Sequence, residues 1–319
     1  MALKDLLRDA KRRAPISVVQ AVNRFIVLRE HLPSFRETDV WHPSELVWGF
    51  CPRQRVLMKR EEVEWPEGEV NVELMRIFDI GHALHQWYQE RYLGPARVLW
   101  GKWRCSRCHA VVEGTMPESS CKQCQWHTEK ERYSLLTPFA CQCHCDVGDD
   151  MRLVRGDEKV ASRGGCNHCG RWGRWEYLEP RVRIEEQNIS GKADGLLVEG
   201  GSPDTVLEVK TANSRSYGAR RVVGPSVANV KQIMLYMHGL GKKKGLIVYV
   251  SKNDGQIHEV EVKYDRAVIE PELANAALCE KAMQDEKEPL PPRIEACKSM
   301  RSPPVKGCPV GALCMGCRS

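Results

Sequence analysis

The chain has 319 residues, of which 42% are hydrophobic and 28% are charged, and this composition predicts a folded globular protein of one large domain or two smaller ones. Residues 1–13 are basic but lack the apolar core of a signal peptide, and no apolar run approaches the ~20 residues of a membrane span. We therefore expect a cytoplasmic protein that has no membrane partner. The formal net charge of +6 leaves room for a basic face that binds a phosphate backbone, but it does not identify the partner by itself.

The N-terminal part of the chain predicts helices. Residues 3–30 contain two helical stretches separated near Pro15, and a turn-rich stretch follows around residues 42–44. A further helix is predicted within residues 72–93, where a stripe of residues recurs every three or four positions and is expected to be buried. The stripe consists of Leu74, Phe78, Gly81, His85, Tyr88 and Tyr92.

The composition changes between about residues 104 and 173, which hold nine of the 15 cysteines and show little helical or strand periodicity. In a long, charged chain such cysteines indicate metal sites in a reducing cytosol, rather than disulfides. Strands are expected on both sides of this stretch, at Arg97–Trp103 and Trp175–Gln187. It therefore resembles a metal-stabilised insertion at the edge of a sheet, with Trp103, Trp126 and Trp172 among the side chains that could stack on a DNA strand.

Two Cys-x-x-Cys pairs separated by twelve residues predict a tetrahedral zinc site. Its ligands would be Cys105, Cys108, Cys121 and Cys124. A second zinc site is expected at Cys143, Cys145, Cys166 and Cys169, with Cys141, His144 and His168 as alternative ligands. Nested pairing of the knuckles stays open, and we expect both zinc ions to be structural.

Two strands are predicted after the insertion, at Ile189–Val198 and Thr205–Thr211, with a turn at residues 199–204 between them. The elements expected after them are a helix, an apolar strand and a final helix, at Ser226–Leu240, Gly245–Ser251 and Pro271–Glu286. This order predicts an α/β domain whose central sheet is mixed and flanked by helices.

Asp194, Glu208 and Lys210 lie on the two neighbouring strands and could surround one divalent ion. Cutting a phosphodiester requires an ion that polarises the phosphate and lowers the pKa of the attacking water, and a lysine could position that water or help to deprotonate it. Glu208 and Lys210 share one face of their strand. Pairing 198 with 205 would however place 194 opposite 209, so the site requires a register shift of one residue, through a bulge or a connection of odd length. Asp204, in the literal Pro-Asp dipeptide, is expected to lie in the turn.

Three more side chains could complete this site. His85, next to Gly81 on its helix, could reach the ion from the side opposite the strands. Gln232 and Tyr236 share a helix face and could contact the phosphate or the carboxylates. Each of them alone is equally typical of ordinary packing.

These motifs resemble the iron-sulfur branch of the RecB-like PD-(D/E)XK nucleases, which includes CRISPR-associated adaptation nucleases, the AddB nuclease domain and phage relatives. The resemblance runs through Gly81-x-x-x-His85, the Asp194 segment, Glu208-Val-Lys210 and Gln232-x-x-x-Tyr236, over roughly residues 41–317 without the insertion. The residue before Asp194 is Ala193, where the family's motif has Pro. The resemblance implies a restriction-endonuclease-like core and catalytic roles for His85, Asp194, Glu208, Lys210, Gln232 and Tyr236. It also implies Mg²⁺ or Mn²⁺ at His85, Asp194, Glu208 and Val209.

Family members carry one cysteine before the nuclease core and three after it, which together hold a 4Fe-4S cluster and clasp the chain ends. The resemblance implies this role for Cys51, Cys297, Cys308 and Cys314, with Cys317 as an alternative ligand. Four thiols suffice for a cubane cluster or for zinc, so spacing alone does not decide the metal.

The predicted organisation has four parts: an N-terminal helical region that carries the first cluster cysteine, a nuclease core, the zinc-binding insertion and a C-terminal cluster-binding segment. Their bounds are 1–71, then 72–103 with 174–285, then 104–173, and finally 286–319. The expected function is a metal-dependent DNA nuclease, an exonuclease on single strands or DNA ends, in DNA repair, recombination or phage DNA processing. A recombination or replication protein is a possible partner.

Two other readings of the sequence compete with a nuclease. The first is a catalytically silent DNA-binding or assembly protein that uses zinc and iron-sulfur modules. The second is a zinc-ribbon transcription factor, which explains the insertion but leaves the acidic strands unexplained.

Overall fold

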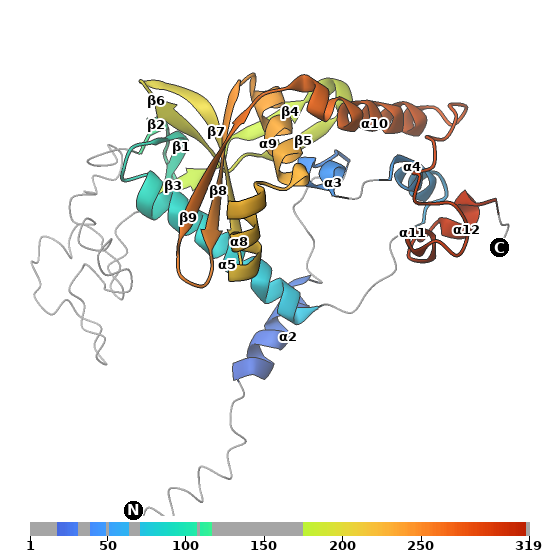
Figure 1. The fold of residues 1–319 in the computed structure, drawn as a ribbon, viewed down its shortest axis with the longest axis horizontal. Helices are drawn as coiled ribbons and strands as arrows, with labels where there is room; N and C mark the ends of the chain where they lie inside the picture. Colours follow the sequence, from blue (N-terminus) through green and yellow to red (C-terminus); the bar gives the residue numbers. More distant parts are fainter. Residues whose placement is uncertain are drawn as a thin grey trace, which may run out of the picture.

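The computed structural model describes residues 18–30, 39–48, 51–63, 71–106, 109–116 and 175–316 (Figure 1). Several cysteines assigned above lie outside these residues. They are the first zinc site's Cys108, Cys121 and Cys124, the second site's Cys141, Cys143, Cys145, Cys166 and Cys169, and the alternative cluster ligand Cys317.

Among the described residues, seven strands form one mixed sheet in the order β2-β1-β6-β7-β8-β9, with β3 also pairing with β1. Strands β7 and β8 are parallel, and every other pair of described strands in this sheet is antiparallel. The strands are β1 (Leu99–Cys105), β2 (Val111–Thr115), β3 (Trp175–Leu178), β6 (Gly195–Glu199), β7 (Ser202–Ala212), β8 (Lys244–Ser251) and β9 (Ile257–Lys263). A separate pair is formed by β4 (Arg181–Ile184) and β5 (Ile189–Lys192).

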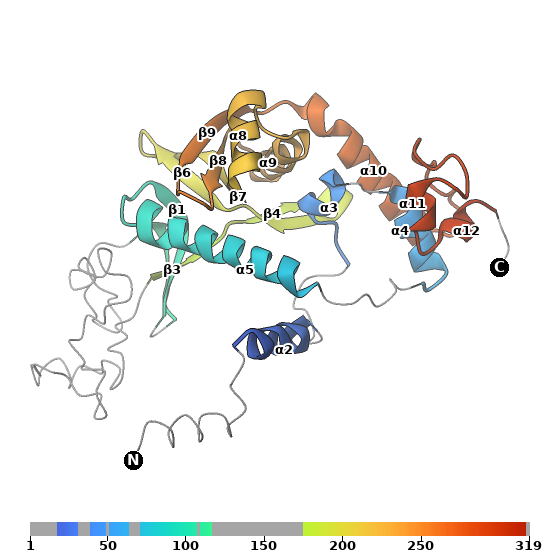
Figure 2. The same cartoon turned by 60° about the horizontal axis from the view of Figure 1, so that its bottom comes forward.

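Helices flank the sheet, which confirms the predicted mixed α/β architecture (Figures 1 and 2). They are α2 (Val18–Glu30), α3 (Pro43–Val47), α4 (Pro52–Arg60), α5 (Val72–Trp87), α8 (Ser214–Val223), α9 (Val227–Leu240), α10 (Arg266–Gln284), α11 (Pro303–Lys306) and α12 (Gly311–Cys314). A π-helical segment, η1 (Tyr88–Leu93), continues α5, and a short 3₁₀ helix, η3 (Glu185–Gln187), joins β4 to β5. No helix of the described segments combines the length and the hydropathy that crossing a membrane requires.

Helix α9 lies against β7 and β8 and forms the larger core with them. Ser226 caps its first turn by accepting a hydrogen bond from the Asn229 amide at 3.2 Å, and Gly241 ends it in a left-handed conformation. A Cβ at Gly245 would lie 2.8 Å from Met237 Sδ, so the glycine lets the helix approach β8 closely. The predicted helix at 226–240 is confirmed to within one residue.

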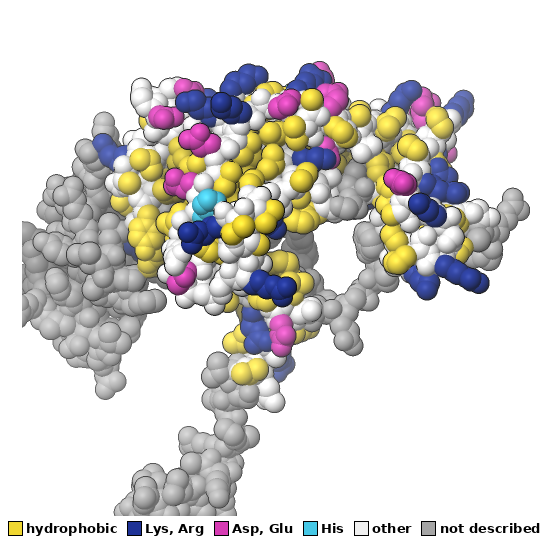
Figure 3. Space-filling model, viewed as in Figure 1, with side chains coloured by type: hydrophobic (Ala, Val, Ile, Leu, Met, Phe, Trp, Pro, Cys, Tyr) yellow, Lys and Arg dark blue, Asp and Glu magenta, His cyan; other side chains and the backbone are white. Residues whose placement is uncertain are grey.

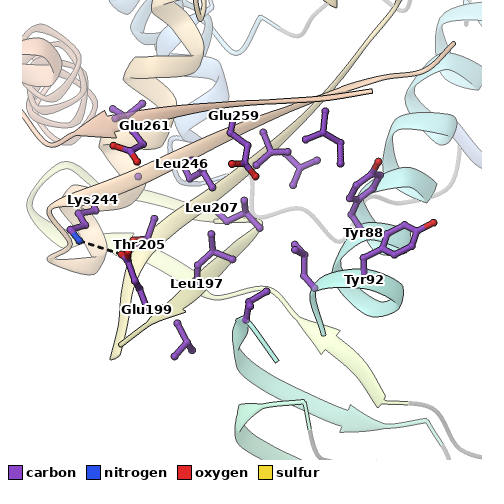
Figure 4. A pocket seen from close by; sticks show the side chains of 18 of the residues that line it. Tyr88, Tyr92, Leu197, Glu199, Thr205, Leu207, Lys244, Leu246, Glu259 and Glu261 are labelled. Atoms are coloured by element: carbon purple, nitrogen blue, oxygen red, sulfur yellow. Dashed lines mark hydrogen bonds and ion pairs between the residues drawn. The ribbon is translucent and has the colours of Figure 1, made fainter. Parts of the chain in front are cut away.

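The other face of the sheet has a second core, built around Trp103, Trp175 and Val209. Beside it lies a cavity of about 810 Å³ between the strands and η1. Leu197, Leu207 and Leu246 line the sheet side of this cavity, across from Tyr88 and Tyr92 of η1 (Figure 4). Hydrophobic side chains also reach the surface over the middle of the molecule (Figure 3).

Several predicted elements differ from the structure. The strand expected at 189–198 is two strands in two sheets, because the Ala193 amide binds Pro180 O at 3.1 Å before the chain crosses to β6. The final helix begins at Arg266 rather than Pro271, since Asp265 caps it through the Ala267 amide at 2.9 Å. Strand β9 was not predicted.

The stripe expected along residues 72–93 is buried only in part. Leu74, Phe78 and Tyr92 are exposed, whereas Gln89 is only 4% exposed. The prediction of one continuous buried face is therefore wrong, because the stripe is exposed at Leu74 and Phe78 of α5 and again at Tyr92 of η1.

Candidate active site

The hairpin of β6 and β7 contains the register shift that the sequence required. Gly195 pairs with Leu207 and Leu197 with Thr205, but Val198 pairs with Pro203, so Asp204 is an extra residue. Continuing the pairing past Gly195 places Asp194 beside Glu208. The expected one-residue bulge is confirmed.

Asp204 is the bulged residue and not part of the turn, so that prediction is wrong. The turn is formed by Gly200 and Gly201, which both have positive φ angles of 59° and 90° that glycine adopts without strain. The Asp204 side chain is 56% exposed and lies 3.6 Å from Lys242 Nζ. Asp204 is therefore not one of the carboxylates that face α9.

Glu208 and Lys210 point to the α9 side of the sheet, and the Val209 side chain belongs to the core on the other side. Lys210 Nζ lies 2.5 Å from Glu208 Oε1 and donates to Gln232 Oε1 at 3.1 Å. Gln232 Nε2 in turn donates to Tyr236 Oη at 3.0 Å. Four of the predicted site residues therefore form one connected chain of contacts.

Asp194 is held by the backbone of the neighbouring strand and faces His85. Its Oδ2 accepts a hydrogen bond from the Val209 amide at 2.6 Å, and its Oδ1 lies 3.5 Å from His85 Nδ1. A Cβ at Gly81 would lie 3.4 Å from Thr211 Oγ1, so α5 passes close to the end of β7. The structure thus brings all six predicted catalytic residues to one place.

Burial and mutual charge shift the ionisation of the site. Burial, and next the charge of Asp194, raise the pKa of Glu208 to about 7, against the opposing effect of Lys210. Burial acts to lower the pKa of Lys210, but the adjacent Glu208 carboxylate raises it overall. In His85, likewise, burial is outweighed by the hydrogen bond and charge of Asp194, and the pKa is raised. Glu208, Lys210 and His85 therefore each lose a proton at a higher pH than they would in water.

One buried oxygen atom of the site has no hydrogen-bond partner among the described residues. Glu208 Oε2 is buried and accepts no hydrogen bond from any group in the described part of the chain. An unsatisfied buried carboxylate oxygen is costly unless a cation binds it. Oxygen donors and an imidazole are also ligands suited to Mg²⁺ and Mn²⁺. As they stand, however, no three His, Cys, Asp or Glu side chains within the described residues form a group that could hold a metal ion.

Gln89 and Glu179 belong to the site but were not predicted from the sequence. Gln89 Nε2 donates to the backbone O of Asp194 at 2.8 Å and to Glu179 Oε1 at 3.1 Å. Gln89 lies four residues after His85, within the π-helical segment η1, and such segments are frequent at functional sites. The spacing from His85 is the signal that could have identified it.

Tyr249 was also missed, although it stands beside Lys210 in the register of β7 and β8. It is 2% exposed, and its hydroxyl accepts a hydrogen bond from Asn229 Nδ2 at 2.8 Å. Because the pair is buried next to the Lys210 stem, it limits the positions that the ammonium can reach.

The structure also gathers the four cysteines predicted to hold a cluster. Cys51 precedes α4, Cys297 lies in the segment after α10, Cys308 precedes α12, and Cys314 ends it. Burial raises the pKa of the Cys51 thiol, and the nearby Cys297, Cys314 and Cys308 raise it further. Four thiols are the right donor type for an iron-sulfur cluster or zinc, although as they stand these four, which all lie among the described residues, do not form a group that could hold a metal ion.

The first predicted zinc ligand, Cys105, is the one member of its set that the structure describes. It ends β1 and is buried in the core with Trp103 and Trp175. The chain then turns back, since the His109 amide binds Cys105 O at 2.8 Å and β2 follows.

Comparisons with known proteins give only weak similarities. No protein-family model matches the sequence, and no curated protein matches it either. An alkaline exonuclease from Laribacter hongkongensis is similar over 34% of this chain and 59% of its own length, with 17% identity and a TM-score of 0.28. A phage-related exonuclease from Haemophilus somnus 129PT is similar over 34% of this chain and 58% of its own, with 13% identity and a TM-score of 0.23.

The solved structure of the protein called SSO0001 is similar over 95% of this chain and 98% of its own, with 13% identity and a TM-score of 0.38. Similarities with such low TM-scores do not establish a shared fold or activity. The function has to be inferred from the residues of the site.

Proposed function

We propose that this protein is a metal-dependent deoxyribonuclease with a restriction-endonuclease-like core, which hydrolyses phosphodiester bonds in single-stranded DNA or at DNA ends. The observation that carries the proposal is the position of Asp194 beside Glu208 and Lys210, set by the bulge in β7. Two carboxylates and an ammonium around one buried point are an arrangement suited to phosphoryl chemistry.

Asp194 and Glu208 would hold Mg²⁺ or Mn²⁺, with His85 beside them. When bound, the ion supplies charge that polarises the phosphate and lowers the pKa of the attacking water. The unsatisfied Glu208 Oε2, and the neighbouring side chains of Asp194 and His85, are the donors that support this assignment.

Lys210 acts as a cation in this mechanism. Because Glu208 raises its pKa, Lys210 keeps its proton at neutral pH and is unsuited to act as a general base. Gln232 and Glu208 hold the ammonium in place, and Tyr236 holds Gln232. Lys210 can therefore orient the water and stabilise the negative charge that develops on the phosphate.

The four clustered cysteines would hold a 4Fe-4S cluster, and the cysteines of the insertion would hold Zn²⁺. Both assignments are structural in this proposal. A cluster at Cys51, Cys297, Cys308 and Cys314 would join the segment before the core to the segment after it, and α4, α11 and α12 lie away from β6 and β7 in Figure 2.

The test compares cleavage of end-labelled single-stranded DNA by the wild type and by Asp194→Asn and Lys210→Met, with Mg²⁺ or Mn²⁺ added. We expect each variant to lose about 10²-fold to 10³-fold in rate, the usual effect of removing a group that stabilises transition-state charge. Asp204→Asn is the matched control and should cleave as the wild type does, since its side chain is exposed at the bulge.

Wild-type rates in Asp194→Asn would contradict the proposal. Binding of DNA by the wild type without any cleavage would instead favour the silent DNA-binding protein. Comparing linear with circular single strands then separates action at ends from internal cleavage.

A further inference from the structure

The end of α8 carries apolar side chains that are almost fully exposed. Val222 and Val223, the last two residues of α8, are 87% and 81% exposed, and Val227 in the first turn of α9 is 70% exposed. These are the three highest exposed fractions of any large hydrophobic residue in the described part of the chain. Single exposed hydrophobic residues are common, but a group of them within six residues marks a surface that contacts a partner. We call these three residues the valine tip.

The packing of α8 explains why the valine tip is exposed. Tyr217 is 6% exposed and holds this helix against the sheet. Successive helical residues are about 100° apart, so Val222 lies about 140° and Val223 about 120° around the helix from Tyr217. Gly224 then turns the chain toward α9 with a φ of 93°, which glycine adopts without strain, and its amide binds Arg220 O at 3.0 Å. The backbone therefore presents the valines away from the core.

Two arginines stand directly before the valines. Arg220 is half-buried and Arg221 is exposed, and within the described segments neither guanidinium is paired with a carboxylate. Positive side chains in the last turn complement the dipole of α8, but this effect needs no direct partner and leaves both guanidinium groups available. Cations beside an exposed apolar surface suit a nucleic-acid strand, in which phosphates and bases lie side by side. These residues therefore complement both parts of a nucleotide.

The valine tip is joined to the candidate active site by both of its helices. Helix α8 begins at Ser214, shortly after Lys210 on β7. On the other side of the tip, Gln232 of α9 accepts a hydrogen bond from Lys210 at 3.1 Å. Gln232 follows Val227 by five residues, which is about 7.5 Å along the helix axis. A strand held at Lys210 would therefore reach the tip within a few nucleotides, since phosphates of a stacked strand are about 3.4 Å apart along its axis.

We propose that the valine tip, together with Arg220 and Arg221, binds the nucleic-acid strand next to the phosphodiester held at the active site. The valines pack against an unpaired base, and the arginines bind the phosphates on either side of it. The bases of a duplex are stacked on one another except at its ends, so the tip favours a single strand or a frayed end. The identity of this ligand rests on the proposed function, and the tip contributes to affinity and not to the chemical step.

The experiment measures binding of a fluorescein-labelled oligothymidine by fluorescence anisotropy at several salt concentrations, without added divalent metal. Val222→Ser/Val223→Ser should weaken binding roughly tenfold and leave the salt dependence unchanged, because it removes apolar surface that the base covers. Arg220→Gln/Arg221→Gln should instead lower the magnitude of the slope of log affinity against log salt by about 1.4, which is about 0.7 for each phosphate. A labelled strand of the same length that consists of abasic sites separates the two contacts. The valine variant should bind this strand as tightly as the wild type does.

Matched controls remove the same groups from other surfaces. Val19→Ser/Val22→Ser changes two valines of α2 that are 58% and 39% exposed, and it should keep the wild-type affinity. Arg24→Gln/Lys263→Gln removes two exposed positive charges from α2 and β9, and it should keep the wild-type slope. The valine variant replaces exposed side chains only, so it should also unfold at the wild-type Tm.

Wild-type affinity in the valine variant, an equal loss on the abasic strand, or an unchanged slope in the arginine variant overturns the proposal, as does a wild type that binds no oligonucleotide. The nuclease proposal is tested separately by metal-dependent hydrolysis of bis-(p-nitrophenyl) phosphate, an ester too small to reach the tip from the active site. Hydrolysis by the wild type, with unchanged oligothymidine binding in both tip variants, rejects the tip alone. The expected losses in the two tip variants, without any wild-type hydrolysis of this ester or of DNA, support the tip and reject the nuclease.

Discussion

Two regions of the molecule bring together residues that are far apart in the sequence, and they do so by different means. Asp194, Glu208 and Lys210 are positioned by the backbone pairing of β6, β7 and β8, and by the Val209 amide. Three of the four clustered cysteines lie instead outside helices and Cys314 ends the four-residue α12, beside a core of three buried residues, Leu57, Met58 and Val310. The first region is organised by the fold itself, whereas the second has little apolar core to organise it.

Side-chain hydrogen bonds hold α4 against the C-terminal part of the chain, but not against the segment that carries Cys297. Arg60 Nη2 donates to Ala282 O at 2.7 Å and to Glu288 O at 2.9 Å, and Arg53 Nη1 donates to Pro291 O at 3.1 Å. These bonds secure α4 to the last turn of α10 and to the chain just after it, and none of them reaches Cys297. The comparison therefore predicts that the order of the cysteine region depends on the metal proposed for it, whereas the arrangement of the active site does not depend on that metal.

The largest expected effect comes from Cys51→Ser. This change should abolish metal binding by the cysteine region, because a metal centre with four thiolate ligands loses a quarter of its donors. We expect iron per chain and visible absorption to fall to background in anaerobically purified protein, and limited proteolysis to cut after residue 286. The hydrogen bonds of Asp194 and Lys210 should be unaffected.

Cys279→Ala is the matched control for this experiment. Cys279 is a buried thiol whose Sγ lies 3.5 Å from Pro52 O, close to Cys51 but outside the predicted ligand set. It should retain the wild-type metal content. Zinc without visible absorption in the wild type would show that the region holds zinc, and metal retained in Cys51→Ser would contradict the assignment.

The sequence predicted the parts of the site that obey simple periodicity. Strand alternation placed Glu208 and Lys210 on one face, helical spacing paired Gln232 with Tyr236, and the mismatch in the hairpin pointed to a bulge. It misplaced Asp204 in the turn, because a Gly-Gly pair can form a two-residue turn on its own and leaves Asp204 to the strand. The predicted turn at 199–204 is therefore longer than the two-residue turn at Gly200 and Gly201.

The sequence did not reveal features that depend on tertiary packing. A π-helical segment changes which residues after His85 face the strands, and no local pattern announced it. Strand β9 alternates between exposed charged residues and inward Val260 and Val262, but the pattern is short and lies at the sheet edge. Phe78 looked like core from its spacing, yet the sheet does not extend far enough to cover it.

A smaller effect is expected from Gln89→Met, which tests how far the fold alone organises the active site. The variant removes the bonds to Asp194 O and Glu179 while keeping the length of the side chain. A buried carbonyl left without its donor costs about 1–3 kcal/mol, and part of that cost should appear as a roughly tenfold loss in affinity for Mn²⁺. Titration calorimetry of the two proteins measures it.

Gln86→Met, one turn earlier on α5, is the control for this change. Gln86 is exposed and donates a hydrogen bond to Glu90 Oε1 at 3.2 Å, so its loss should alter Mn²⁺ affinity less than twofold. Equal affinities in the wild type and Gln89→Met would show that the bonds of Gln89 do not position Asp194.

The smallest expected effect is a pH dependence of stabilisation by Mn²⁺. Glu208, with its pKa raised from 4.5 to about 7, and His85, with its pKa also raised, both bind protons more tightly in the folded state. Their protonation therefore stabilises the metal-free protein at low pH, and this contribution is lost as the pH rises through about 7. Mn²⁺ competes with these protons for Glu208 and His85. The other titratable groups at the site are Asp194, Lys210 and Tyr236.

Between pH 6 and pH 8 the ionised fraction of Glu208 would rise about tenfold, which corresponds to about 1.4 kcal/mol of additional stabilisation by the ion. Differential scanning fluorimetry should accordingly show that Mn²⁺ raises the Tm by roughly 2–4 °C more at pH 8 than at pH 6. Asp194→Asn should show no such difference, because it lacks one of the two carboxylates. A larger Mn²⁺ effect at pH 6 would mean that the ion binds elsewhere, since protons compete for the Glu208 site most strongly there.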